Sequence, residues 1–140
     1  MPATLLRRIG AMLYDTLLLL AVLMLVTGVL HLATGGEAIV GRTHPVLVWF
    51  SRAVRVASVV GFFGLFWTRG GQTLGMAAWH LRVERLDGRR LTWGDTVRRL
   101  AASLLSWAPA GLGFLWILFD RDRRAWHDRL SGTRVLRVTG

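Results

Sequence analysis

The sequence is short of several residue types, and each shortage limits what the protein can do. Its 140 residues include no cysteine, no lysine and no asparagine, and only one glutamine. Without cysteine, the chain cannot form disulfides, thiolate metal sites or cysteine nucleophiles. Acidic residues are also scarce, because 8 of them stand against 18 basic residues, all arginine, which gives a formal net charge of +10.

What the chain does have is apolar residues, which make up 53% of it. A soluble domain of this size rarely combines so much apolar content with so much charge of one sign. The two are compatible when apolar blocks lie in lipid and basic blocks lie at the headgroups. The sequence therefore predicts a small, mostly helical integral membrane protein that forms a single domain over residues 1–140.

Two apolar blocks are long enough to cross a bilayer. They cover residues 9–32 and 46–67, and the first would extend over roughly 36 Å as a helix. Arg7 and Arg8 precede the first block, so the positive-inside rule places the N-terminus in the cytoplasm. A cleaved signal peptide is the alternative for the first block, but that block is long and no clean cleavage site follows it. Trp49 and Trp67 lie near the ends of the second block, as interfacial anchors do.

The segment between the second and third apolar blocks differs in kind. Apolar and polar residues alternate over residues 80–86, which is typical of a strand, and Asp87 and Gly88 form a turn signal. Residues 89–93 could run back as the second strand, so the sequence predicts a cytoplasmic β-hairpin over about 80–93. Thr92-x-x-Asp95 resembles a capping box for a helix that runs to Trp107.

The third apolar segment, residues 100–119, is interrupted at Pro109 and at two glycines that follow it. A third crossing would put the basic tail, residues 120–140, outside the cell, against the positive-inside rule. The alternating residues 133–138 could add a third strand to the hairpin, but a third crossing would put them on the other side of the membrane from it. We therefore favour a re-entrant or interfacial helical hairpin over a third span, with both termini cytoplasmic.

Asp15 is the strongest candidate for a functional group. It lies about 9 Å inside the first span, where a carboxylate is costly unless it is paired, protonated or hydrated. Arg8 is seven residues upstream and therefore lies on nearly the same helix face. The two side chains can address one cavity but are about 10 Å apart along the axis, too far for a relaxed ion pair. Asp15 is either a proton or cation site or a polar group that orients the helices, and the sequence leaves both open.

The second span carries two different stripes. Small residues follow one face and predict a packing surface on which the first helix approaches closely near Gly61. The residues of this stripe are Ala53, Ala57, Gly61 and Gly64. Arg52 and Arg55 lie on the other side, where they either extend to the outer headgroups or line a polar groove.

No pattern indicates an enzyme. The four histidines lie on different segments without ligand spacing, so we expect no metal and no cofactor. Residues 70–75 are rich in glycine but lack the Lys-Ser/Thr pair of a phosphate-binding loop. The basic excess surrounds apolar spans, which fits anionic lipid headgroups better than nucleic acid.

Three short motifs together resemble the RDD family of bacterial membrane proteins, named for one arginine and two aspartates. Arg8 and Asp15, in RRIGAMLYD, match the start of its first helix. Residues 71–75 (GQTLG) match the turn after its second span, although Met76 stands where a basic residue is common. The turn at residues 126–135 (WHDRLSGTRV) supplies the second aspartate, which we assign to Asp128.

Asp120 is the reserve for that second aspartate. The resemblance covers nearly the whole chain, and it implies a domain with two membrane spans that is proposed to take part in transport.

Two functions follow as hypotheses. The first is an oligomeric transporter or an ion- or proton-coupled carrier component, with Arg8, Asp15 and Asp128 as the coupling residues. The second is a non-catalytic scaffold or accessory subunit that binds anionic lipids or a partner protein. Either would operate in the bacterial inner membrane, and we expect a homo-oligomer or a membrane partner protein. A transporter requires one of these, because so short a chain cannot enclose a substrate path alone.

Overall fold

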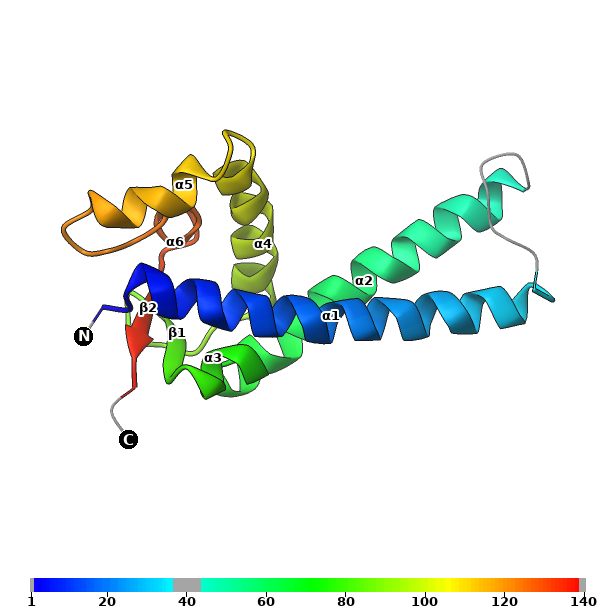
Figure 1. Ribbon diagram of the computed structural model, residues 1–140, viewed down its shortest axis with the longest axis horizontal. Helices are drawn as coiled ribbons and strands as arrows, with labels where there is room; N and C mark the ends of the chain where they lie inside the picture. The colour runs from blue at the N-terminus through cyan, green and yellow to red at the C-terminus, as the bar shows by residue number, and fades with distance from the viewer. Residues whose placement is uncertain (1, 37–43, 139–140) are drawn as a thin grey trace.

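Two long helices dominate the part of the chain that the computed structural model describes, which is residues 2–36 and 44–138. The elements in chain order are α1 (Leu5–Ala33), α2 (Pro45–Gly70), α3 (Leu74–Ala78), β1 (Leu81–Arg85), α4 (Trp93–Trp107), α5 (Leu112–Leu115), the 3-10 helix η1 (Trp116–Leu118), α6 (Trp126–Leu130) and β2 (Thr133–Arg137). All the shorter elements gather around the start of α1 and the end of α2, and we call this assembly the packed end (Figure 1). The rest of α1 and α2 extends away from it.

α1 and α2 contain the two predicted spans and extend beyond both of them. They have 29 and 26 residues, and each is long and apolar enough to cross a membrane. In their most apolar stretches, 0% of the residues of α1 and 6% of those of α2 are buried within the chain. Such long, exposed apolar surfaces suit lipid and not water. α2 ends at Gly70 and is capped by Gly71, whose φ of 67° is left-handed and suits glycine.

The third apolar segment is sharply bent. α4 and the α5–η1 segment meet at 103°, so this part of the chain is not one straight helix. α4 ends just before Pro109, and the turn that follows puts Ala110 and Gly111 in left-handed conformations. The predicted break at Pro109 is therefore confirmed. Whether the bent segment enters the bilayer from one side stays a prediction.

The small sheet pairs segments that lie far apart in the sequence. β1 and β2 are antiparallel, with Val83 opposite Val135, and an isolated bridge joins Pro2 to Leu136. The predicted hairpin over 80–93 is therefore wrong, although its first strand and the strand in the tail both exist. Only residues 89–91 separate the Gly88 turn from the Thr92 cap, which leaves too little chain for a second strand.

α4 begins where the sequence predicts, directly after Thr92. Thr92 accepts a hydrogen bond from the Asp95 backbone, and the Asp95 carboxylate accepts one from the Thr92 backbone. Arg85 also pairs with Asp95 at 2.9 Å, which fixes the end of β1 to the start of α4. The capping box and the end of this helix at Trp107 are thus confirmed.

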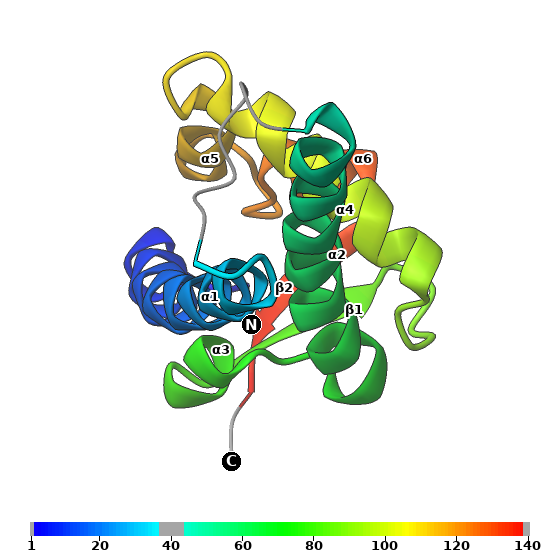
Figure 2. The same ribbon diagram turned by 90° about the vertical axis from the view of Figure 1, so that its right-hand side faces the viewer.

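The hydrophobic core lies entirely in the packed end. Its buried residues are Ala3, Ala11, Trp67, Met76, Leu81, Val83, Leu91 and Val135. α3 lies against one side of α1, while α4, α5 and α6 lie on the opposite side (Figures 1 and 2). Both ends of the described chain also lie at the packed end (Figure 1), and their location in the cytoplasm stays a prediction.

The close approach of α1 expected near Gly61 is not made. A Cβ atom at Gly61 would meet nothing within 4 Å, whereas one at Gly64 would collide with the ring of Trp93 in α4. Ala53 and Ala57 are exposed. The small residues of α2 therefore do not form one packing surface against α1. Gly64 packs against Trp93 of α4, and a Cβ atom at Gly61 would have no neighbour within 4 Å.

Candidate functional site

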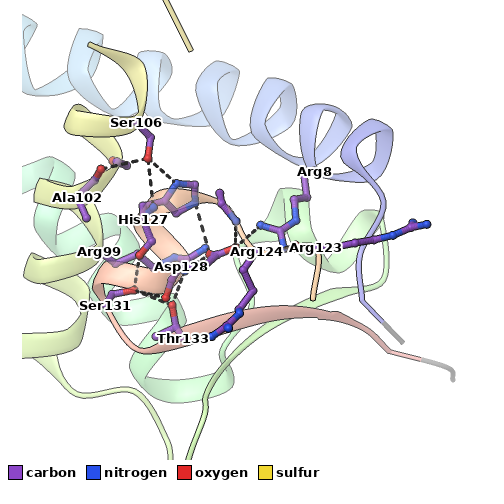
Figure 3. A network of polar contacts seen from close by, with 12 residues as sticks. Arg8, Arg99, Ala102, Ser106, Arg123, Arg124, His127, Asp128, Ser131 and Thr133 are labelled. Carbon is purple, nitrogen blue, oxygen red and sulfur yellow. Dashed lines mark hydrogen bonds and ion pairs between the residues drawn. The ribbon is translucent and has the colours of Figure 1, made fainter. Parts of the chain in front are cut away.

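The centre of the packed end is a buried ion cluster of Arg8, Arg99 and Asp128 (Figure 3). Arg8 Nη1 lies 2.5 Å from Asp128 Oδ2, and Arg99 Nη1 lies 2.5 Å from Asp128 Oδ1. The three side chains are 6%, 4% and 0% exposed, so water screens these charges little. One carboxylate from α6 thus ties the start of α1 to the middle of α4.

Further hydrogen bonds extend this cluster into the tail. Arg99 Nη1 donates to Thr133 Oγ1 at the start of β2, and Arg8 Nη2 donates to the carbonyl of Arg123. The backbone N–H of Ala125 donates to Asp128 Oδ2 at 3.1 Å, which caps the first turn of α6. The cluster therefore joins elements from both ends of the chain.

The charges of the cluster do not balance. Burial alone would raise the pKa of the Asp128 carboxyl, but the adjacent guanidinium groups of Arg99 and Arg8 outweigh it and hold that pKa well below its usual range. Asp128 is therefore ionised, and two positive charges face one negative charge.

His127 lies beside this excess positive charge. Burial, followed by the charge of Arg99, lowers its pKa to about 3. Its backbone N–H donates to Ser106 Oγ at 3.1 Å, and its ring lies 4.6 Å from that of Phe114. The neutral imidazole thus serves as a packing group between α4, α5 and α6.

We expect the protein to lose about 2 kcal/mol of stability through His127 when the pH falls from 7 to 5. The pKa is 6.5 in an unfolded chain and about 3 in the fold. Between these values the unfolded chain binds a proton that the folded chain does not, so stability rises with pH in this range. Thermal unfolding in detergent at both pH values, for the wild type and His127→Gln, measures the effect. Equal pH dependence in the two proteins would show that His127 is not the group responsible.

Asp15 is used to hold α3 against α1. Thr73 Oγ1 donates to Asp15 Oδ2, and the backbone N–H of Gly75 donates to Asp15 Oδ1 at 2.9 Å. A Cβ atom at Gly75 would lie only 2.3 Å from the carbonyl oxygen of Ala11, so only glycine allows this contact. Both oxygen atoms of the carboxylate are thus occupied by the turn at residues 71–75.

Arg8 and Asp15 nevertheless line the same cavity, as the helix geometry predicts. The cavity has a volume of about 640 Å³ and lies between α1, α2 and α4. Its charged or titratable lining residues are Arg8, Asp15, Arg99 and His127. Most of the rest of the lining is apolar side chains from the three helices.

Comparison with known protein families shows that the sequence of residues 2–132 matches the RDD family. The chain belongs to the RDD family. RDD proteins are membrane proteins. The chain is also similar to the uncharacterized protein RP437 of Rickettsia prowazekii (strain Madrid E), with 29% identity over 85 residues.

That similarity covers 61% of this chain and 47% of the relative, so the chain spans about half the length of the relative. No solved structure matches the chain.

The structure gives the RDD motifs a physical meaning. Arg8 and Asp128, 120 residues apart, are in contact, and the GQTLG turn is the partner of Asp15. Asp120, the reserve for the second aspartate, lies outside this cluster. It forms a separate ion pair with Arg129 and accepts a hydrogen bond from the Arg124 backbone at 2.7 Å.

The remaining arginine candidates lie on the extended part of α2. Arg52 is exposed and stacks over the ring of Trp49 at 5.3 Å. Arg55 is half-buried, and neither arginine is among the residues that line the cavity. The described residues also contain no group of three or more histidine or acidic side chains that could hold a metal ion.

Sequence reasoning missed Arg99 and misassigned Trp67. Trp67 is not an interfacial anchor, because it is 7% exposed and Arg99 lies over its ring at 5.2 Å. Arg99 could have been found from helical spacing. Thr96, Arg99 and Ser106 are buried polar residues on one face of α4, at positions i, i+3 and i+10 of an otherwise largely apolar helix.

Proposed function

We propose that the protein is a non-catalytic membrane module, a scaffold or accessory subunit, with α1 and α2 crossing the bacterial inner membrane and the packed end and both termini in the cytoplasm. The observation that supports this role is how the two family aspartates are used. Asp15 has both oxygens engaged by Thr73 and Gly75, and Asp128 has both oxygens in contact with arginines. Both carboxylates therefore serve to fix a preformed unit onto the membrane helices.

The packed end also offers a surface for anionic partners. Arginines that make no side-chain hydrogen bond or ion pair with the described residues line a hollow of about 210 Å³ at the end of α2. They are Arg69, Arg82, Arg89 and Arg90. Glu84 lines the same hollow but is paired with Arg134 at 3.6 Å. An α2 that spans the bilayer would hold this basic surface at headgroup depth, where each arginine near anionic lipid contributes about 1 kcal/mol.

An ion- or proton-coupled carrier component is the second candidate. One observation favours it, namely that Asp15 and Arg8 line a single cavity between helices that could lie in lipid. A carrier of this size would have to be a homo-oligomer or work with a membrane partner.

Asp15→Asn separates the two candidates. Asparagine keeps the size and much of the hydrogen bonding of Asp15 but cannot ionise. For a module, we expect wild-type and Asp15→Asn proteins in proteoliposomes to give the same ion and proton flux at every pH between 5 and 8. A pH-dependent flux in the wild type that the folded Asn variant lacks would establish the carrier instead. Size-exclusion chromatography in detergent serves as the control for folding and assembly.

A further inference from the structure

The cavity between α1, α2 and α4 changes character along its length. Arg8, Arg99 and Trp67 line it at the packed end. Leu19 lines it 11 residues further along α1, and Val56 lines it 11 residues before Trp67 on α2, which corresponds to about 16 Å of helix in each case. One end of the cavity is therefore charged, and the other is apolar and lies between the extended parts of the two long helices.

Buried hydrogen-bond donors at the charged end have no partner. Arg8 Nε and Trp67 Nε1 are buried and make no hydrogen bond with the described residues. The two residues are 5% and 7% exposed. Buried donors are nearly always satisfied, and an unsatisfied one costs about 1–3 kcal/mol. Asp128 Oδ1 also makes no hydrogen bond, but it lies 2.5 Å from Arg99 Nη1 in an ion pair. The two donors on lining residues of one cavity therefore favour a ligand that carries an acceptor.

Charge points to the same kind of ligand. Arg8 and Arg99 carry two positive charges against the single negative charge of Asp128. The hydrogen bonds and ion pairs that Arg99 makes with the described residues use only its Nη1. Asp15 also lines the cavity, but it lies about 10 Å further along α1 than Arg8, and its oxygens are engaged by Thr73 and Gly75. The charged end thus keeps one uncompensated positive charge, which is costly in a buried site unless an anion joins it.

We propose that this cavity binds an anionic phospholipid from the surrounding bilayer. The phosphate accepts hydrogen bonds at the end lined by Arg8, Arg99 and Trp67, and one acyl chain lies along the apolar walls between α1, α2 and α4. The polarity of the cavity then runs parallel to that of a lipid leaflet, with charge near the start of α1 and apolar side chains deeper in the span. This inference rests on the membrane placement given under the proposed function, and it assigns that module a bound lipid.

A pair of tryptophan substitutions on α2 tests the proposal. Val60 lines the cavity, so Val60→Trp fills it. Leu65 lies on the same helix, is 46% exposed and does not line the cavity, so Leu65→Trp is the matched control. Native mass spectrometry of the purified protein, titrated in detergent with phosphatidylglycerol, with zwitterionic phosphatidylcholine or with palmitate, measures the bound lipid.

We expect wild-type protein and Leu65→Trp to retain phosphatidylglycerol at least tenfold more tightly than phosphatidylcholine, a difference of about 1.4 kcal/mol. Val60→Trp should lose most of that binding while it keeps a wild-type thermal midpoint. Equal retention of the two lipids, or wild-type phosphatidylglycerol binding by Val60→Trp, would overturn the proposal. Binding of palmitate without phosphatidylglycerol would also overturn it, because the ligand would then not be a bilayer phospholipid. None of these outcomes depends on ion flux, so the result stands apart from the Asp15→Asn experiment.

Discussion

Replacement of Asp128 by asparagine is expected to lower the free energy of unfolding by about 3–5 kcal/mol. Asparagine has nearly the same shape, but it removes the charge and turns one of the two acceptor oxygens, both of which face arginines, into an NH2 donor. Arg8 and Arg99 would then both be buried without a counter-ion, at 6% and 4% exposure of their side chains. The loss of one partner from a buried ion pair costs far more than the pair contributes, because the remaining charge stays out of water.

Glu84→Gln provides the matched control for Asp128→Asn. Glu84 pairs with Arg134 at 3.6 Å, and the two side chains are 34% and 44% exposed. An exposed pair of this kind is worth about 0–1 kcal/mol. Denaturant unfolding of both variants in detergent micelles gives the comparison. A loss at Asp128 no larger than that at Glu84 would show that the cluster does not hold the packed end together.

Gly75→Ala should also lower the stability of the protein, in this case by a steric clash and not by the loss of a charge. The new methyl group would lie 2.3 Å from the carbonyl oxygen of Ala11 and 2.8 Å from Asp15 Oδ1. The first of these atoms belongs to the backbone of α1, so α3 must move away and stretch the 2.9 Å hydrogen bond from Gly75 to Asp15. Overpacking and the weakened hydrogen bond together predict a loss of about 2–4 kcal/mol.

Gly61→Ala, in contrast, should stabilise the protein. A Cβ atom there meets nothing within 4 Å, and alanine is favoured over glycine inside a helix by about 1 kcal/mol. Thermal midpoints of the two variants in one detergent, together with protease cleavage within residues 71–80, provide the test. Equal midpoints for Gly75→Ala and Gly61→Ala would mean that α3 is not held tightly on α1.

Local patterns allowed the long elements to be predicted from the sequence. Apolar runs defined α1 and α2, the Thr92–Asp95 pair located the start of α4, and Pro109 marked the bend after it. Each of these signals lies within one segment, so it determines the local structure independently of contacts with the rest of the chain. Alternation in residues 133–138 likewise predicted the strand in the tail.

Contacts between distant segments were harder to predict. The first strand was given the wrong partner because alternation shows that a strand exists but not what it pairs with. Arg98 and Arg99 look alike in sequence, yet Arg98 is exposed and Arg99 is buried beside Asp128. The prediction that α1 packs on the small residues of α2 was wrong for the same reason. Small residues permit a close approach, but they do not determine which helix makes it.

A double-mutant cycle between Arg8 and Asp128 tests most directly the claim that these residues from the two ends of the chain act as one unit. The free energy of unfolding is measured in detergent for wild type, Arg8→Gln, Asp128→Asn and the double variant. We expect the double variant to lose about 1–3 kcal/mol less than the sum of the single losses, because each single change removes the same contact. Losses that add to within about 0.5 kcal/mol would contradict the account.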